Sequence, residues 1–341
     1  MPRRAHLIGS VPLQDAGSVF ATVTDILGSF CRRIPDGETG ERGYWIRWQN
    51  GTFANCPGLE AVAVTQSLPG FKDAVKRTFY RIKPGVDPAS IIFGELGYTR
   101  EALASYAIFS QMTAEGKISP ETRFLVALPT PVALLSGFVT IESRTDVEPA
   151  IERAIFEDVA RLQDGIPHDR LSIQLDVCYE VVGNDGGPPL HYGDAVAGSA
   201  ERIGRLCGSV DSDVEIGIHL CYGDPGHQHI VQPTHLGTCV SFANAICLAS
   251  RRRIDFMHMP VPRERGDDAY FEPLRRLKMP SETHLVLGLV HYTDGIDGTR
   301  ARMAVADRFV ADYDVASECG FGRRDPSTIE HLLRVHRAVC A

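Results

Sequence analysis

A histidine and a cysteine stand two residues apart near the end of a short apolar segment. The segment reads Ile216-Gly217-Ile218-His219-Leu220-Cys221. Because alternate side chains of a strand share one face, His219 and Cys221 are expected to point the same way. Imidazole and thiolate are good zinc ligands, and zinc prefers four ligands in a tetrahedron. A buried cysteine beside a hydrogen-bonded histidine is the more ordinary interpretation of one such pair, so the pair alone does not decide.

A second cysteine, Cys319, ends another such segment, Val315-Ala316-Ser317-Glu318-Cys319. Two strands that present cysteines at the same end favour a metal site over two packed core thiols. One histidine and two cysteines leave the fourth position of zinc open, which suits a catalytic site better than a structural one. Thiolates bound to a metal are deprotonated, and a substrate thiol at the open position would be too. The chemistry indicated is the activation of sulfur as a nucleophile.

Acidic side chains also stand at the ends of apolar segments. Asp36 and Glu38 close one segment, and Asp176 closes another. A carboxylate that follows an apolar segment is costly to bury without a partner, and an ammonium group on a substrate would be one such partner. For Glu38, an ion pair with a nearby arginine such as Arg42 explains the residue equally well.

Several further residues are weaker candidates for binding or catalysis. His258 and His291 end two more apolar segments, where each alone suits a packed histidine, although several histidines at one end of a sheet are unusual for a scaffold. Ser10 follows Ile8-Gly9 and suits a turn. His227 and His229 belong to a loop, where side chains ordinarily face solvent.

The chain must bring these segment ends together, and its pattern predicts how. Eight apolar segments are expected to be strands, namely residues 5–12, 31–38, 123–131, 171–180, 214–223, 253–262, 283–294 and 314–322. Helical periodicity marks residues 16–30, 99–115, 147–163, 200–207, 299–312 and 325–341. The last helix is expected to be capped by Asp325, with Pro326 at its first position. Eight strand–helix units predict an α/β fold, a closed (β/α)8 barrel whose active site lies at the carboxyl ends of the strands.

One long excursion interrupts this alternation. Residues 43–87 contain both tryptophans and are expected to lie between the second strand and its helix, as an insertion in a single barrel domain of residues 1–341. Long excursions at this end of a barrel build active sites. A doubly wound open sheet is the competing fold, but no Gly-x-Gly-x-x-Gly follows a strand here.

Composition excludes several classes of protein. There are 35 Lys and Arg against 43 Asp and Glu, a net charge of −8, which argues against a nucleic-acid partner. The 9 cysteines are odd in number and scattered, which suits a reducing compartment. The most apolar stretch, residues 124–139, is too short and too interrupted to span a bilayer. We therefore expect a cytoplasmic enzyme without a membrane partner, and the sequence does not indicate an oligomeric state.

The order of these pieces resembles the C-terminal catalytic barrel of cobalamin-independent methionine synthase over nearly the whole chain. The matching pieces are Ile8-Gly9-Ser10-Val11-Pro12, Asp36-Gly37-Glu38 with Glu41-Arg42, Asp176, His219-Leu220-Cys221 and Cys319-Gly320. The resemblance implies the same barrel, with zinc bound by His219, Cys221 and Cys319 and no cobalamin. It also implies that Ser10, Glu38 and Asp176 hold the amino acid homocysteine, whose sulfur joins the zinc and accepts a methyl group.

The sequence departs from this family at four places. The family's fourth zinc ligand, a glutamate, falls on Pro260, and His258, two residues earlier on the same strand face, is the candidate replacement. Cys178 is a candidate extra thiol where the family has Glu-Pro after the aspartate. His291, a candidate acid or base, stands about two residues before the family's catalytic histidine. The family's N-terminal barrel is missing from this sequence, so the resemblance does not extend to folate as donor.

The sequence thus predicts a single-barrel, zinc-dependent methyl- or alkyltransferase. Its partners would be a small-molecule thiol acceptor and an alkyl donor that the sequence does not name. A zinc-dependent lyase or an epoxide-opening thiol transferase on the same barrel is the first alternative. A degenerate barrel without metal, which binds a small molecule or a partner, is the second. The absence of the family's glutamate favours that last reading, and the His219, Cys221 and Cys319 set opposes it.

Overall fold

The structure is a computed structural model that describes residues 3–66, 75–225 and 228–341. In this part of the chain, eight parallel strands form one sheet in the order β1-β10-β9-β8-β7-β6-β5-β2. Their bounds are β1 (Ala5–His6), β2 (Arg33–Pro35), β5 (Arg123–Pro129), β6 (Leu171–Val177), β7 (Glu215–Leu220), β8 (Phe256–Pro260), β9 (His284–Val290) and β10 (Asp314–Ser317). Single bridges from Ala5 to Cys31 and from Ser10 to Gly37 join the two ends of this order. The sheet therefore closes, and the predicted (β/α)8 barrel is confirmed.

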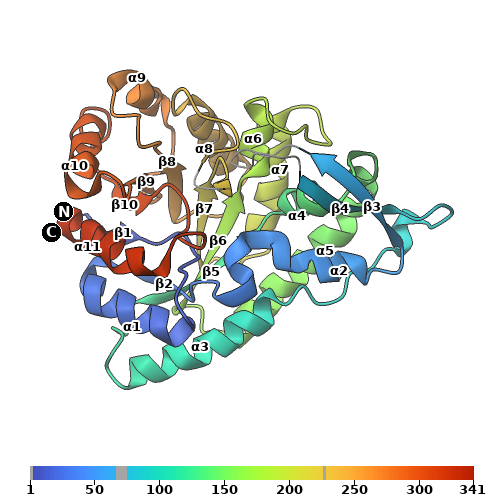
Figure 1. Cartoon of the computed structure of the whole chain (residues 1–341), viewed down its shortest axis with the longest axis horizontal. Coiled ribbons are helices and arrows are strands. Elements are labelled where there is room, and N and C mark those ends of the chain that lie inside the picture. Colours follow the sequence, from blue (N-terminus) through green and yellow to red (C-terminus); the bar gives the residue numbers. More distant parts are fainter. Residues whose placement is uncertain (1–2, 67–74, 226–227) are drawn as a thin grey trace.

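Helices follow the strands and surround them (Figure 1). They are α1 (Ala16–Leu27), α3 (Tyr98–Ala114), α4 (Pro131–Phe138), α5 (Arg144–Gly165), α6 (Tyr179–Asn184), α7 (Ala195–Gly208), α8 (Gly237–Ala249), α9 (Asp268–Phe271), α10 (Gly295–Ala306) and α11 (Ile329–Cys340). Short 3-10 turns are η1 (Gly28–Phe30), η4 (Ile141–Ser143), η6 (Glu272–Arg276) and η7 (Pro326–Thr328). The predicted cap Asp325 accepts the N–H of Ser327 and starts η7, after which α11 begins. Within the described ranges, no helix has the length and apolarity needed to cross a bilayer.

The paired strands are shorter than the apolar segments that predict them. Strand β1 covers only Ala5–His6, and β6 ends at Val177 because Cys178 has helical backbone angles (φ −113°, ψ −65°) and precedes α6. Leu7 and Val11 follow β1 outside the ladder and are still buried. An apolar segment therefore predicts which residues are buried and not which are paired in the sheet. Burial continues past the last paired residue into the loops that cover the barrel's mouth.

The excursion after β2 is a small layer of its own. It consists of η2 (Gly40–Gln49), α2 (Asn50–Ala54), the antiparallel pair β3 (Leu59–Gln66) and β4 (Val75–Ile82), and η3 (Pro88–Ser90). Residues 67–74 of the predicted insertion at 43–87 lie outside the described residues. Phe53 stacks on Phe138 of α4, with ring centroids 4.7 Å apart, and the Thr140 N–H donates to the Tyr80 carbonyl at 3.0 Å. These contacts attach the excursion to the barrel's outer layer beside α4, at the right of Figure 1.

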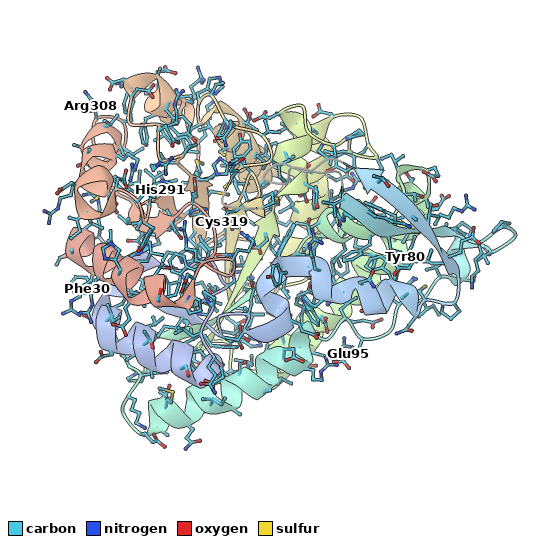
Figure 2. All side chains as sticks on the ribbon, in the orientation of Figure 1. Phe30, Tyr80, Glu95, His291, Arg308 and Cys319 are labelled. Atoms are coloured by element: carbon cyan, nitrogen blue, oxygen red, sulfur yellow. The ribbon has the colours of Figure 1, made fainter. Side chains whose placement is uncertain are left out.

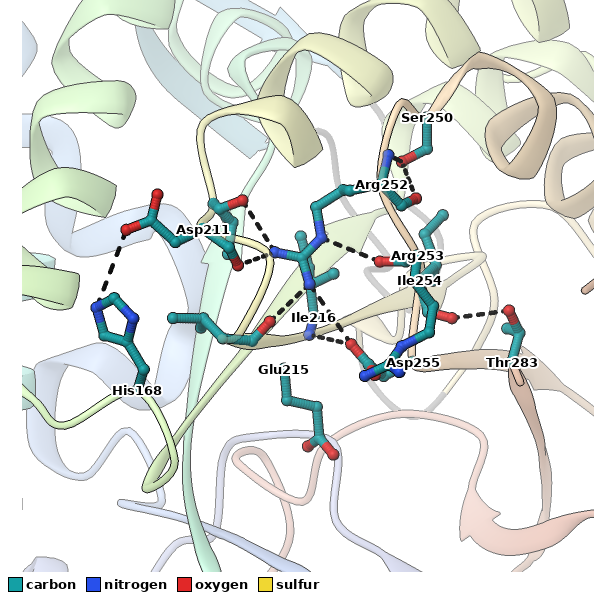
Figure 3. Close-up of polar contacts among 12 residues, drawn as sticks. His168, Asp211, Glu215, Ile216, Ser250, Arg252, Arg253, Ile254, Asp255 and Thr283 are labelled. Atoms are coloured by element: carbon teal, nitrogen blue, oxygen red, sulfur yellow. Dashed lines mark hydrogen bonds and ion pairs between the residues drawn. The ribbon is translucent and has the colours of Figure 1, made fainter.

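The basic residues 251–253 connect the amino ends of two strands, at the end of the barrel opposite its mouth. The Arg252 guanidinium donates to the carbonyls of Val210 at 2.9 Å and Val214 at 2.6 Å, which precede β7 (Figure 3). Arg252 and Arg253 also form ion pairs with Asp255, just before β8. These arginines therefore act in local structure at the amino ends of the strands, far along the barrel from its mouth.

Gly37 lies where the barrel closes. Its φ of +83° belongs to the left-handed region, and a Cβ placed on it would lie 2.6 Å from Val19 Cγ2 and 3.1 Å from the Val11 carbonyl oxygen. The Val11 N–H donates to the Gly37 carbonyl at 2.7 Å. Only glycine combines this backbone angle with this close approach.

We expect Gly37→Ala to lower the free energy of unfolding by about 2–5 kcal/mol, since left-handed backbone costs alanine about 1–2 kcal/mol and the forced contacts add about 1–3 kcal/mol. Gly40→Ala is the matched control: its φ is also positive, at +69°, but a Cβ there meets nothing within 4 Å. Denaturant unfolding measures both variants. Equal losses would contradict the packing argument.

Candidate metal and substrate site

Six of the predicted site residues line one cavity of about 470 Å³ at the barrel's mouth. They are Ser10, Glu38, Asp176, His219, Cys221 and Cys319. The six residues stand at the carboxyl ends of β1, β2, β6, β7 and β10. Figure 2 labels Cys319, which lies well inside the outline of the molecule. Barrel closure, and not proximity in the sequence, brings these side chains together.

The thiols of Cys221 and Cys319 face each other across this cavity. Their Sγ atoms are 3.8 Å apart, and these atoms and one ring nitrogen of His219 all lie within 4.8 Å of one another. Tetrahedral zinc with Zn–S bonds of about 2.3 Å holds two sulfurs roughly 3.8 Å apart, whereas the sulfurs of a disulfide are about 2.05 Å apart. The observed separation therefore suits two thiolates that share one metal ion.

Neither thiol ionises readily by itself. The neighbouring Cys178 thiol and burial raise the pKa of Cys221 well above its ordinary value, and Cys221 and burial do the same to the pKa of Cys319. Two groups favour the thiolates instead: the Gly223 N–H donates to Cys221 Sγ at 3.2 Å, and the Arg323 guanidinium lies 3.8 Å from Cys319 Sγ. Two adjacent thiolates still need a close cation, and a metal ion is one that would fit.

A hydrogen bond between two histidines determines which ring nitrogen of His219 is available to bind a metal. His219 Nδ1 and His258 Nδ1 are 2.8 Å apart, and His258 Nε2 is 3.0 Å from the Ser317 carbonyl oxygen. A carbonyl only accepts, so His258 Nε2 carries a hydrogen. Burial lowers the pKa of His258 to about 4, so its ring is neutral and its Nδ1 accepts. His219 Nδ1 therefore donates, and Nε2 of His219 keeps the lone pair that a metal would bind.

His258 does not stand where a fourth ligand would. Both of its ring nitrogens are engaged, by His219 and by the Ser317 carbonyl, so in this arrangement His258 would orient His219 and would not itself bind a metal. Pro260, at the end of β8, has no side-chain donor atom. Among the described residues, the set of potential ligands at the mouth is His219, Cys221 and Cys319.

A second group of potential ligands lies at the other end of the barrel. His168, Asp211 and Asp213 precede β6 and β7, and both aspartates are exposed (Figure 3). His168 Nδ1 is 2.9 Å from an Asp213 oxygen, and this contact raises the pKa of His168. The group is therefore an ion pair on the protein surface.

Two carboxyls line the cavity, that of the buried Asp176 and that of the half-buried Glu38. Burial and the negative charges of Asp176 and Asp36 raise the pKa of Glu38 to about 8. Burial raises the pKa of Asp176 to about 7, although the Gln174 amide donates to it at 2.9 Å. Arg42 forms an ion pair with Asp36 at 2.8 Å. The arginine that the sequence suggested as a partner for Glu38 therefore pairs with Asp36 instead. Among the described residues, no Lys or Arg forms an ion pair with Glu38 or Asp176, which suits an ammonium group on a ligand.

Backbone strain is concentrated at this cavity. Among the described residues, only Glu38 (φ +46°) and Trp45 (φ +58°) are non-glycine residues with positive φ. Both line the cavity. Such angles cost about 1–3 kcal/mol and persist where the surroundings enforce them, commonly at functional sites.

Ser10 links the mouth to the loop that carries Cys319. Its hydroxyl oxygen accepts the Gly322 N–H at 3.1 Å, and its carbonyl accepts the Phe321 N–H at 2.7 Å. The hydroxyl hydrogen of Ser10 stays available to a ligand in the cavity. Ser10 is therefore both the turn residue that its position suggests and a wall of the site.

His291 lies in a neighbouring cavity. Its Nε2 donates to the Val261 carbonyl at 2.8 Å, and its Nδ1 is 3.7 Å from a Glu318 oxygen (Figure 2). His229 contacts the same carboxylate at 3.1 Å and is buried, contrary to the solvent-facing position expected for it. These residues line a cavity separate from that of the thiols. His227, the other histidine of that loop, lies outside the described residues.

Some residues of the site could not be predicted from the sequence. Trp45 belongs to the excursion, which was expected to approach the mouth, but nothing in the sequence singles it out from Trp48. Arg323 stands four residues after Cys319, and its guanidinium also donates to Asp224 at 3.1 Å. Their contacts arise from loops whose paths apolar periodicity does not encode.

Comparison with known proteins supports the architecture. No protein-family model and no curated protein sequence matches the chain. Among solved structures, it is similar to a B12-independent methionine synthase from Shewanella sp. W3-18-1 in complex with selenomethionine, with 13% identity, a TM-score of 0.60, and coverage of 100% of this chain and 97% of that one. It is also similar to a protein proposed to be a vitamin-B12-independent methionine synthase from Listeria monocytogenes, with 14% identity, a TM-score of 0.59, and coverage of 99% and 98%. At this identity the likeness shows a shared fold along the whole chain.

The raised carboxyl pKa values make stability depend on pH. We expect the unfolding equilibrium constant of the wild type to rise, relative to Glu38→Gln, as the pH increases from about 4.5 to about 8. In this window the folded protein holds a proton on Glu38 that the unfolded chain has lost, so stability decreases with pH. The relative change should reach at least about tenfold, the equivalent of one pKa unit. Denaturant unfolding across this range measures it.

Glu330→Gln is the control for the general effect of losing one negative charge, because Glu330 is an exposed residue of α11. Its difference from the wild type should stay nearly constant over the same pH range. A Glu38→Gln difference that is equally constant would mean that Glu38 keeps an ordinary pKa in the folded protein.

Proposed function

We propose that the protein is a zinc-dependent transferase that moves an alkyl group, most simply methyl, to the sulfur of a small thiol. The observation that carries this proposal is the 3.8 Å separation of the Cys221 and Cys319 sulfurs, with a ring nitrogen of His219 within 4.8 Å of both. The fold shared with structures described as B12-independent methionine synthases supports it as well. The reaction needs no cobalamin, and the donor is left open.

His219, Cys221 and Cys319 would hold the zinc, leaving one position for the acceptor. Zinc supplies a lowered thiol pKa, so that a bound thiol is a thiolate near neutral pH. Glu38 and Asp176 would receive an ammonium group of the acceptor, and an occupied site would offset the cost of burying both carboxylates. An amino thiol is therefore the acceptor class that the walls of the cavity favour.

The transfer itself is a displacement at carbon. The thiolate sulfur forms a bond to the alkyl carbon, the bond between that carbon and the donor breaks, and its electron pair leaves with the donor. The proton that the thiol loses passes to solvent. Arg323, beside Cys319, reduces the cost of the negative charge on the sulfurs throughout. The acid–base role suggested for His291 stays a prediction, since that residue faces Glu318 in the next cavity.

Zinc content tests the proposal directly. We expect about one zinc per chain in the purified protein and a loss of most of it in Cys221→Ser and in Cys319→Ser, because each change removes one of the thiolate ligands. Cys247→Ser, which alters a partly exposed thiol of α8, is the control and should keep its zinc. Elemental analysis measures all four proteins. A wild type that is free of metal and resists loading with zinc would leave only a binding barrel.

The hydrogen bond between His219 and His258 predicts that changes at His258 weaken zinc binding, by an amount that depends on the replacement. We expect His258→Ala to weaken zinc binding about 10- to 100-fold, the usual cost of losing the partner that orients a histidine ligand. His258→Gln, which can still accept from His219 Nδ1, should weaken it less. Competition with a chelator measures the affinity.

His291→Ala is the matched control for this effect, because it removes another buried histidine at the same end of the barrel that does not touch His219. Its zinc affinity should stay at the wild-type value. Equal affinities in His258→Ala and the wild type would show that the ring of His219 needs no support from β8.

A further inference from the structure

A fully buried glutamine inside the barrel connects two walls of the thiol cavity. Gln174 belongs to β6, and its amide nitrogen lies 2.6 Å from the Ile8 carbonyl oxygen and 2.9 Å from Asp176 Oδ1. Asp176 and Ile8 both line the cavity, and Ile8 stands two residues before Ser10. Because β1 and β6 are not neighbours in the sheet, this one side chain links two separate parts of the barrel's mouth.

The partners of Gln174 fix the orientation of its amide. The Ile8 carbonyl only accepts, so the atom that faces it is the amide nitrogen, which donates its second hydrogen to Asp176 Oδ1. The amide oxygen then accepts from His6 Nε2, 2.9 Å away. Burial and the charge of Arg33 lower the pKa of His6, so its ring is neutral and carries its one hydrogen on Nε2. The hydrogen bonds therefore run in one direction, from His6 through Gln174 to Asp176.

Packing across neighbouring strands holds the His6 ring. Gly217 of β7 pairs with Phe256 of β8, and a Cβ on Gly217 would lie 2.1 Å from the Phe256 ring. The Phe256 ring therefore fills the space beside Gly217, where it packs against the His6 ring with centroids 4.8 Å apart. Gln174 pairs with Gly217 from the side of β6, so the amide lies in the same layer as the ring that supports His6.

Polar groups at this depth are costly, because their surroundings are apolar. Ile8 and Phe256, which contact Gln174 and His6, belong to a buried hydrophobic cluster. Within the described part of the chain, Nδ1 of His6 is buried and has no hydrogen-bond partner. An apolar residue in place of His6 would avoid that cost. The network is therefore better explained by what it does to the carboxyl at its end than by stabilisation of the fold.

We propose that Gln174 and His6 are positioning residues for the ammonium group of the acceptor. Gln174 occupies Oδ1 of Asp176 and leaves Oδ2 for the ligand, and its bond to Ile8 fixes the distance from this carboxyl to the wall that Ser10 forms. His6 keeps the amide nitrogen, and not the amide oxygen, turned towards the carboxyl. That the ammonium group belongs to a thiol rests on the proposed function, whereas its recognition by an oriented carboxyl rests on this network.

Two thioethers that differ in one group test this role in the full chain. 2-(Methylthio)ethylamine carries an ammonium group, 2-(methylthio)ethanol is its neutral counterpart, and neither has a free thiol. We expect the wild type to bind the amine at least about tenfold more tightly, equivalent to one charge-assisted contact. Gln174→Met, which keeps the length of the side chain, should lose about tenfold of the amine affinity and keep its affinity for the alcohol within about twofold. Titration followed by NMR measures every affinity.

Two variants of His6 separate its hydrogen bond from its packing. His6→Phe keeps a ring against Phe256 but has no N–H for the amide, whereas His6→Gln has an N–H but no ring. We expect His6→Phe to lose about threefold of the amine affinity, the equivalent of one neutral hydrogen bond, and His6→Gln to retain more of it. If His6→Gln binds the amine no better than His6→Phe, His6 has no positioning role.

Gln49→Met is the matched control. Gln49 is also fully buried and its amide donates to the Leu96 carbonyl at 2.8 Å, but it does not line the thiol cavity. This variant should bind both probes like the wild type. Equal binding of the two probes by the wild type, or an undiminished preference for the amine in Gln174→Met, would overturn the proposal. Equal losses of both probes in Gln174→Met, which a purely structural role predicts, would overturn it too, as would the absence of saturable binding.

The outcome is separable from that of the proposed function. The ammonium contact involves carboxyls and no sulfur, so Cys221→Ser should lose zinc and keep the wild-type ratio of the two affinities. If the protein proves to hold no zinc, the probes still decide whether Gln174 orients the carboxyl of Asp176. If zinc is bound and the preference for the amine is absent, the positioning role fails and the metal site stands.

Discussion

The approach of two sulfur atoms from different parts of the chain is the contact on which the rest of the site depends. Cys221 follows β7 and Cys319 follows β10, two strands that are not neighbours in the sheet, and closure of the barrel brings their Sγ atoms to 3.8 Å. Glycines make the last part of this approach possible. A Cβ on Gly320 would lie 2.4 Å from Ser10 Oγ, and one on Gly322 would lie 2.4 Å from the Gly43 carbonyl oxygen. The loop that carries Cys319 therefore rests directly on the ends of β1 and of the excursion.

Charge is distributed unevenly around these sulfurs. The carboxyls of Glu38 and Asp176 line the thiol cavity, and the guanidinium of Arg323 lies 3.8 Å from Cys319 Sγ. Beyond Trp45, an adjoining cavity holds Arg47 and Arg77. Glu38 and Asp176 therefore line one cavity, and Arg47 and Arg77 line the cavity that adjoins it.

The fold and most of the cavity were predictable from the sequence for the same physical reason. Apolar segments that end in polar residues mark the carboxyl ends of strands, and in a parallel barrel those ends converge whatever their separation in sequence. The contacts of single atoms were not predictable. Which ring nitrogen of His258 meets His219 is decided by the Ser317 carbonyl on another strand. Arg47 and Arg77 come together only because the excursion folds into a hairpin beside η2, and no periodicity marks that path.

Strand register places His258 beside His219 and Pro260 beside Cys221. Asp176, His219 and His258 are paired in one layer across β6, β7 and β8. Cys221 stands two residues further, about 6.6 Å nearer the mouth at 3.3 Å per residue, and the position on β8 that matches its layer is Pro260. His219 lies in the same layer as His258 and its ring reaches the sulfurs, whereas the His258 ring is held between His219 and the Ser317 carbonyl. At that level β8 carries Pro260, which has no donor side chain, so a metal held by His219, Cys221 and Cys319 would keep one coordination position open, as a catalytic centre does and a structural one does not.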